Sequence, residues 1–399
     1  MKKIIFFILF LFISTNTLAQ DMDLFSQDEE NLFEQDTQIE AVSKKDTKIT
    51  NELIEEKRID LTGQLRHSLT YSMNRNWLSG NGAWTDNTWS TLTYGDLFFD
   101  IRLYQGLKAY IDIGYVNLPA TSNTGLASAV DFKEIFIDFN LKDKIYFRTG
   151  KQVLKWGRSY FWNPTDLINV ESRNFLNLDY LRTGTYGTKA HIPFGYAQNL
   201  YFFLNYNQTS NLDDLALATK YEFIAGNSEI GLSLWTKKDA YSVYGLDFST
   251  SLMDFTIYGE MALASNVKPR SSLTLSRNLD FDITDRFSLI YEIFYNGQGY
   301  NKKVTLNPTS VFTANELSTW YSAMFFSINK YPWTYFTTSL HALVNMVDRS
   351  FIVSLGTKYT SIHNFDLAFT TNYYFGPENA EYTYLGQGMD VRFEAGIQF

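Results

Sequence analysis

Apolar and polar residues alternate along the last eleven positions of the chain, residues 389–399. The apolar positions are Met389, Val391, Phe393, Ala395, Ile397 and Phe399. The polar positions between them are Asp390, Arg392, Glu394, Gly396 and Gln398. Because successive side chains of a strand point to opposite faces, this pattern predicts a strand with one apolar and one polar face. Its length matches the roughly 9–11 residues of a tilted strand that crosses a membrane.

The same alternation recurs in about eighteen short stretches from residue 58 onward. It predicts an all-β fold, a transmembrane antiparallel up-and-down β-barrel of about 18 strands (16–18) with lipid outside and water inside. The side chains that we expect to face the lumen include Arg66, Asp100, Arg102, Glu134, Asp138, Glu260, Arg392 and Glu394. Strict alternation also places His67 on the lipid side, where a site near the rim or a β-bulge would accommodate the ring.

The connections between these stretches alternate between short and long, which gives a second test of a barrel. The short ones are residues 105–106, 142–144, 282–285, 329–332 and 361–364. The long ones are residues 117–129, 155–183, 297–317 and 376–387. Bacterial outer-membrane barrels have short periplasmic turns and longer outer loops, so the pattern favours a chain that ends on the periplasmic side. Residues 155–183 would then form the third outer loop.

The sequence divides into three predicted segments: a signal peptide (1–19), an acidic periplasmic extension (20–57) and the outer-membrane barrel (58–399). Lys2 and Lys3 precede about ten apolar residues and a small-residue cleavage site ending at Ala19, as in a secretory signal. The extension is either a disordered leader or a docking segment, because Leu-Phe pairs recur at residues 24–25 and 32–33. Whether it plugs the lumen is left open.

Composition narrows the chemistry. The chain has no Cys and four His, which excludes disulfides and thiolate sites, and we expect no metal and no cofactor. The net charge is −9, and residues 20–58 hold twelve acids against five bases, so the barrel has no basic surface for nucleic acid. Aromatic residues make up 17 % of the chain. Interfacial Trp belts predict outer-end positions for Trp77, Trp84, Trp89, Trp156, Trp162, Trp235 and Trp320, with Trp333 on the periplasmic side.

The third outer loop is the most distinctive stretch. Its aromatic residues would be exposed to water unless the loop folds into the barrel mouth, so we predict an inward-folded loop. Asn163 followed by Pro164 has the pattern of a helix start, with Asn163 as the N-cap. The candidate constriction residues are Lys151, Gln152, Lys155, Trp156, Arg158, Trp162, Asn163, Asp166, Arg173 and Arg182.

Charges in this region allow two interpretations. Residues 151–189 hold six bases and three acids, and a ring of basic side chains in a channel selects anions. Alternatively, these bases pair with one another and with lumen acids such as Glu134 and Asp138, which would brace the loop against the wall. The sequence leaves both open.

Two stretches resemble known outer-membrane families. The terminal strand, with Phe393, Ile397 and the final Phe399, resembles the assembly signal of bacterial outer-membrane proteins, which implies recognition by the barrel-assembly machinery. The segments Gly150-Lys151-Gln152, Trp156-Gly157 and Asn163-Pro164-Thr165-Asp166 resemble porin families related to alginate-export barrels. That resemblance implies a third loop that narrows a channel.

The sequence therefore predicts a porin-like channel in the bacterial outer membrane for small hydrophilic solutes, including anionic or sugar-like ones. Its expected partners are membrane lipid and the solute, and association into a homo-oligomer is left open. Three alternatives remain: an exporter of a polysaccharide or other product, a closed structural barrel, and an outer-membrane hydrolase. The hydrolase is disfavoured, because His341 and Ser339 share a face but no Gly-x-Ser-x-Gly elbow accompanies them. We expect no enzymatic activity.

Overall fold

The computed structural model describes the barrel-forming part of the chain. The described residues are 58–78, 80, 87–104, 106–117, 128–166, 168, 184–207, 214–240, 242–264, 267–281, 285–303, 317–384 and 386–399. The predicted signal peptide and acidic extension lie outside these residues, as do Arg173 and Arg182. No helix in the described part is long and apolar enough to cross a membrane.

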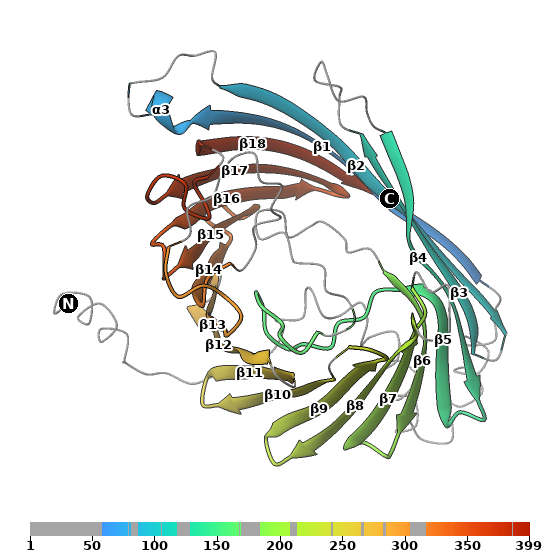
Figure 1. The fold of residues 1–399 in the computed structure, drawn as a ribbon. Helices are drawn as coiled ribbons and strands as arrows, with labels where there is room; N and C mark the ends of the chain where they lie inside the picture. The colour runs from blue at the N-terminus through green and yellow to red at the C-terminus, as the bar shows by residue number, and fades with distance from the viewer. Residues whose placement is uncertain are drawn as a thin grey trace.

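Within the described residues, eighteen strands form one closed antiparallel barrel (Figure 1). Their bounds are β1 Arg58–Asn74, β2 Thr88–Tyr104, β3 Leu107–Asn117, β4 Ser128–Leu141, β5 Ile145–Gln152, β6 Thr185–Pro193, β7 Gln198–Asn205, β8 Ala216–Ala225, β9 Ser228–Lys237, β10 Val243–Leu252, β11 Phe255–Ala264, β12 Val267–Phe281, β13 Asp285–Asn296, β14 Trp320–Asn329, β15 Phe336–Asn345, β16 Phe351–Ile362, β17 Phe365–Phe375 and β18 Gln387–Gln398. A four-residue helix, α3 (Arg75–Leu78), follows β1. Each strand pairs with its neighbours in sequence, and β1 pairs with β18 to close the ring. The predicted up-and-down barrel is confirmed.

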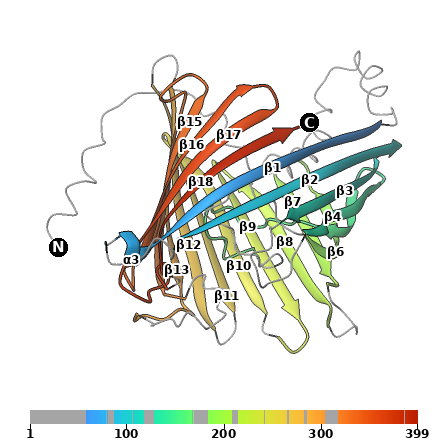
Figure 2. The same ribbon diagram turned by 90° about the horizontal axis from the view of Figure 1, so that it is seen from above.

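The connections alternate as predicted. At one end of the barrel the strand bounds leave connections of only two to six residues, from 105–106 to 330–335. At the other end the connections include the longest, residues 153–184 and 297–319. Figure 2 shows neighbouring strands running side by side with a common tilt, as in a sheared barrel. The chain begins β1 and ends β18 at the end with the short turns.

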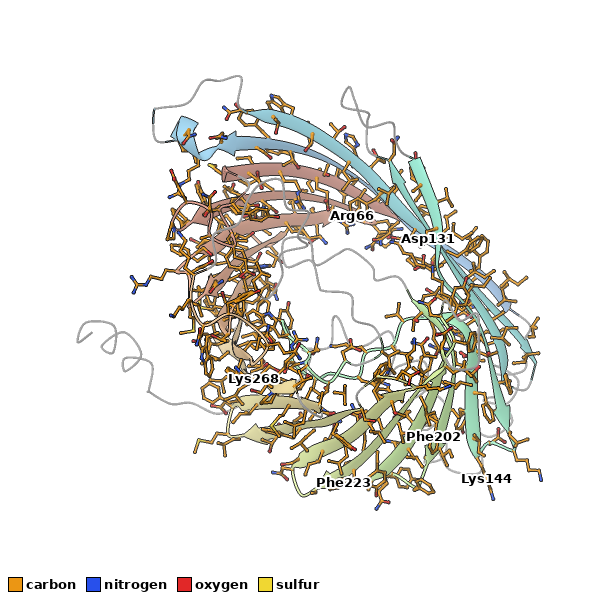
Figure 3. All side chains as sticks on the ribbon, viewed as in Figure 1. Arg66, Asp131, Lys144, Phe202, Phe223 and Lys268 are labelled. Atoms are coloured by element: carbon orange, nitrogen blue, oxygen red, sulfur yellow. The ribbon has the colours of Figure 1, made fainter. Side chains whose placement is uncertain are left out.

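The two faces of the wall differ as the alternation requires. Leu65 and Phe393 are 42 % and 56 % exposed on the outer face, whereas Arg66 and Glu394 are 3 % and 8 % exposed on the inner face. Arg66 lies on the inner side of the wall in Figure 3. An apolar outer face and a polar inner face place lipid outside the barrel and polar groups within it.

The terminal residue takes part in closing the barrel. Its N–H donates to the carbonyl of Gly63 at 2.9 Å, and its carbonyl accepts from the Gly63 N–H at 2.7 Å. The side chains of Phe393, Ile397 and Phe399 are all exposed on the outer face. Their role as an assembly signal stays a prediction.

His67 lies on the outer face, as strict alternation requires, and no β-bulge interrupts the pairing around it. Its Nδ1 atom is 2.8 Å from the hydroxyl of Thr93 on β2, so one ring nitrogen has a polar partner across the strand pair. The hydroxyl on the neighbouring strand thus accommodates the polar ring of His67, and no β-bulge is required.

The lipid-interface environment that a Trp belt implies is wrong for three residues. Trp89 and Trp320 are exposed on the outer face, and Trp333 is exposed in the turn 330–335. By contrast, Trp156 and Trp162 are buried within the barrel, and Trp235 packs against the same interior cluster as Trp156. These three have a protein environment because the third loop covers the wall there. The side chains of Trp77 and Trp84 lie outside the described residues.

Candidate functional site

The connection between β5 and β6, residues 153–184, is here called loop 3, and its residues 153–166, 168 and 184 are described. Residues 153–166 and 168 fold inward, and the green trace inside the ring in Figure 1 follows this part. Its apolar side chains are buried: Leu154 and Trp162 are each 2 % exposed. The inward fold follows from the need to remove these side chains from water.

Loop 3 packs against the wall through two apolar clusters. In the first, Leu154, Trp156 and Ile168 contact Phe203 on β7 and Ala218 on β8. In the second, the members are Phe161, Trp162, Ile290, Phe294, Tyr321, Ala323 and Leu343. The rings of Trp162 and Phe294 stack with centroids 5.2 Å apart. The loop therefore runs along the inner wall from β7 to β15.

A buried carboxylate, Glu260 of β11, binds the middle of the loop. Its oxygens accept hydrogen bonds from the N–H groups of Arg158 at 2.5 Å, Ser159 at 2.6 Å and Thr165 at 3.1 Å. The hydroxyl of Thr165 donates a fourth at 2.8 Å. Loop 3 has no helix or strand over these residues, so its buried N–H groups need acceptors from outside the loop.

A second buried carboxylate, Glu292 of β13, binds the tip of the loop in the same way. It accepts from the N–H groups of Tyr160 at 3.0 Å, Phe161 at 2.8 Å and Trp162 at 2.7 Å. The Thr274 hydroxyl of β12 adds a fourth donor at 2.9 Å. Each wall carboxylate is thus satisfied by several donors, which is what permits its burial.

Arg158 reaches the wall through its guanidinium. It donates to Asp247 of β10 at 2.5 Å, to Glu222 of β8 at 3.2 Å and to Glu229 of β9. Lys220 of β8 bonds Glu222 at 2.8 Å and Asp247 at 3.2 Å. Burial opposes the charge of Arg158, but the Glu222 and Asp247 carboxylates outweigh it and hold its pKa above the ordinary value. The pairing interpretation therefore describes Arg158, which is matched by three acids.

Lys151 does not line a constriction, contrary to our expectation. The register places it opposite Ile135 and Tyr186, both exposed on the outer face. Its ammonium bonds the Phe132 carbonyl at 2.5 Å and Asp131 at 3.3 Å. Paired residues of antiparallel strands share a face, and β5 continues through residue 152, so Lys151 belongs to the outer face of the wall.

Two other candidate constriction residues, Gln152 and Lys155, lie near the start of the loop. Gln152 is fully buried, and its amide donates to the carbonyls of Arg148 at 3.3 Å and Gly187 at 3.1 Å. It supports the point where the loop leaves the wall and does not face water. Lys155 is half-buried within the loop.

The predicted helix start at Asn163 is a turn. The Asp166 N–H donates to the carbonyl of Asn163 at 3.1 Å, which closes the turn around Pro164 and Thr165. The Thr165 N–H, which a capping side chain would bind, donates to Glu260 instead. The wall carboxylate therefore takes the donor that the N-cap prediction assigned to Asn163.

The strand register puts all eight predicted lumen residues on the inner face. Arg66 binds Asp366 at 2.9 Å and Glu394 at 3.0 Å. Asp100 pairs with Arg102 at 3.3 Å, near the end with short turns.

The other four occupy the inner wall between β4 and β18. Asp138 pairs with Arg148 at 2.7 Å, and Glu134 accepts the Val153 N–H at 2.6 Å at the base of loop 3. Glu260 lies beneath the loop, and Arg392 is half-buried opposite two threonines, Thr70 and Thr370. The lumen acids therefore hold the loop as well as lining the wall.

Sequence reasoning missed Glu292, Asp247, Glu222, Glu229 and Lys220. One signal was present: Glu292 is the single charged residue in the run from Leu289 to Tyr295, whose other residues are apolar or aromatic on both faces. A charged residue within such a run indicates a buried partner.

A second outer connection, residues 376–386 and here called loop 9, also folds inward. Glu381 is 3 % exposed and accepts hydrogen bonds from the Tyr321 hydroxyl at 2.7 Å and the Asn345 amide at 2.6 Å. Its own N–H donates to Asp348 at 2.8 Å. Tyr382 packs against the cluster that contains Phe161 and Trp162. Loop 9 therefore meets the tip of loop 3 on the inner wall.

Loop 9 should hold less tightly as the pH rises. Burial, with the neighbouring Asp348 charge, raises the pKa of Glu381 from the ordinary 4.5 to about 7, against the hydrogen bonds from Tyr321 and Asn345. The buried group binds its proton more tightly than a released one, so attachment is strongest at low pH. It should weaken by about 3 kcal/mol between pH 4.5 and 7. The natural chain has no Cys, so thiol labelling of an Ala380→Cys variant, buried when the loop is closed, measures opening.

The same labelling in a Glu381→Gln background supplies the control, because the thiol has its own pH dependence in both variants. The glutamine removes the titrating group and keeps the size of the side chain. Labelling that accelerates equally with pH in both backgrounds would contradict the assignment to Glu381.

Metal binding and hydrolysis are two other chemistries that side chains of a lumen can support. No group of three or more His, Cys, Asp or Glu side chains in the described ranges is arranged to hold a metal ion. His341 lies on the inner face of β15 opposite Ser354, with its ring 4.6 Å from the Phe325 centroid in an edge contact.

A closed 18-stranded antiparallel barrel with an apolar outer face and an inward third loop has the architecture of a bacterial outer-membrane porin. No protein-family model matches the sequence, and no curated protein matches it. Among solved structures, OccAB4 of Acinetobacter baumannii aligns with a TM-score of 0.57 and 9 % identity, over 87 % of this chain and 99 % of that one.

Two further solved structures have the same fold. OccK2 (OpdF) of Pseudomonas aeruginosa, in complex with glucuronate, aligns with a TM-score of 0.53 and 9 % identity, over 86 % of this chain and 98 % of its own. A BenF-like porin from Pseudomonas fluorescens Pf-5 aligns with a TM-score of 0.53 and 10 % identity, over the same shares. At such identities the likeness shows the fold, a porin-like barrel.

Proposed function

We propose that this chain forms a water-filled channel through the bacterial outer membrane for small hydrophilic solutes. The observation that carries the proposal is the one-sided position of the described part of loop 3, residues 153–166 and 168. The described part of the loop packs on the wall from β7 to β15. The facing wall, from β16 through β18 to β5, presents polar and charged inner side chains such as Arg66, Thr370 and Arg392. Eighteen strands enclose more space than side chains fill.

The polar inner wall also bears on the class of solute. One solved neighbour is in complex with glucuronate, and a small, sugar-like solute would suit the polar wall of this barrel as well. Recognition of Phe399 by the barrel-assembly machinery and association into a homo-oligomer belong to the same proposal. The resemblance of loop 3 to alginate-export-type barrels supports a second candidate, an exporter of a secreted polymer.

Planar bilayers and liposomes test the proposal. The refolded barrel should give stepwise ionic currents, and liposomes that contain it should swell in small sugars, more slowly as the sugar grows. Heat-denatured protein at the same concentration is the control. Silent bilayers would contradict the channel and favour a closed barrel. Equal permeation by oligosaccharides and monosaccharides would favour the exporter.

A further inference from the structure

We propose that the channel prefers cations, and that Glu229 is the side chain that sets this preference at loop 3. This inference rests on the proposed function, because it assigns a charge class to the solutes of that channel. The excess of bases in residues 151–189 had instead suggested a channel that selects anions. Cation preference follows because acids on the barrel wall, which lie outside residues 151–189, face the bases of loop 3.

The first observation is the charge balance around Arg158. Its guanidinium contacts Glu222, Glu229 and Asp247, and the second cation of the cluster, Lys220, bonds two of the same acids. Two positive charges therefore face three negative ones. Acidic side chains in a channel wall favour cations in the same way that basic ones favour anions.

The second observation concerns the other charges beneath loop 3. The partners of Glu260 are N–H and hydroxyl groups, which carry no formal charge to cancel that of its carboxylate. Besides Arg158, the described part of the loop carries Lys155 and Asp166, whose charges are of opposite sign. The loop therefore adds no net positive charge that would offset the excess of acid around Arg158.

The exposed fractions of the charged side chains around Arg158 show which of them is in contact with the solution in the channel. The side chain of Glu229 is 54 % exposed, against 17 % for Arg158, 22 % for Glu222 and 4 % for Lys220. Asp247 is fully buried. A charge in contact with water acts on mobile ions over a screening length of about 10 Å at 0.1 M salt. Glu229 is thus the member of the cluster with the greatest access to the solution.

The solved neighbour in complex with glucuronate holds an anion, whereas this chain would favour solutes of positive charge. The two proteins share 9 % identity, so their similarity shows a common fold and does not show that they have the same charges on the channel wall. The preference inferred here depends on side chains of this chain alone.

The test is the reversal potential of single channels under a tenfold KCl gradient, with the dilute side below 0.1 M so that screening is weak. The full-length mature barrel should give a K⁺/Cl⁻ permeability ratio above one. Glu229→Gln should lower that ratio about twofold to fivefold, from Coulomb's law for one charge about 8 Å away in water. Glu229→Asp keeps the charge and should keep the ratio. Glu229→Lys should bring the ratio below one.

The matched control is Asp143→Asn. Asp143 is exposed in the short turn between β4 and β5, where its φ of 53° suits asparagine. It loses the same charge outside the lumen and should leave the ratio unchanged. Channels that conduct but prefer chloride, or a Glu229→Gln ratio equal to that of Asp143→Asn, would overturn the inference and leave the proposed channel standing. Bilayers that stay silent would overturn both. Heat-modifiable migration in gels confirms that each variant is folded before recording.

Discussion

Replacing Glu292 with alanine should detach the tip of loop 3 and lower the free energy of unfolding by on the order of 4 kcal/mol. The carboxylate accepts three loop N–H groups and one hydroxyl within the barrel. If the loop stays in place, three buried N–H groups lose their acceptor, at about 1–3 kcal/mol each. If it leaves, Phe161 and Trp162 lose their apolar contacts. Either response destabilises the barrel.

Urea unfolding of the Glu292→Ala protein in detergent micelles measures the loss of stability. Single-channel recording measures the detachment of the tip of loop 3. A detached tip should give larger and noisier currents, because loop 3 then occupies the lumen less regularly. Glu292→Gln keeps one acceptor oxygen and the volume of the side chain, so its loss of stability should be intermediate.

Glu378→Ala is the matched control for this variant. It removes a glutamate from loop 9 whose side chain is exposed, so both stability and current should match those of the natural chain. If Glu292→Ala behaved like Glu378→Ala, the wall carboxylate would not be an anchor of the loop.

The alternation of residues was sufficient to predict the strands because most of the wall separates lipid from a polar interior. Stretches such as β1 and β18 therefore show one apolar and one polar face. β13 departs from the rule: Ile290 and Phe294 on its inner face are as apolar as Tyr291 on its outer face. The reason is local, since loop 3 covers this part of the inner wall and keeps it dry.

The charge pattern of the site could not be predicted from sequence for a different reason. Arg158 meets acids that lie 64, 71 and 89 residues away in the chain. Only the closure of the barrel brings β8, β9 and β10 beside the third loop. A count of bases along residues 151–189 therefore recorded the positive partners and left out the negative ones.

A local irregularity also escaped the pattern. The register shifts between Asp112 and Ile113 of β3, where β4 carries one additional residue. Lys133 is that residue, and it is buried with its ammonium 2.5 Å from Asp96. Its neighbour Glu134 still reaches the inner face and binds the Val153 N–H. A β-bulge of this kind changes which side chains face inward without any sign in the alternation.

Replacing Arg66 with leucine should have a comparably large effect on the barrel itself. Arg66 on β1 binds Asp366 of β17 at 2.9 Å and Glu394 of β18 at 3.0 Å, and so ties together the strands that close the ring. Removing the arginine leaves two carboxylates, each under one-tenth exposed, without it. Breaking a buried ion pair by removing one partner destabilises by about 3–5 kcal/mol, which urea unfolding in micelles should detect.

A double-mutant cycle separates the unpaired charge from lost packing. Asp366→Asn should destabilise the natural chain clearly, yet have little effect or a favourable one in the Arg66→Leu background, because it removes a charge that has lost its arginine. Lys358, 3.7 Å from Asp366 and 37 % exposed, screens that charge only partly. Arg102→Leu is the control: its pair with Asp100 is half-exposed and should be worth under about 1 kcal/mol. Equal losses of stability for Arg66→Leu and Arg102→Leu would contradict the prediction, because they would show that burial does not make the Arg66 ion pairs stronger than the exposed Arg102 pair.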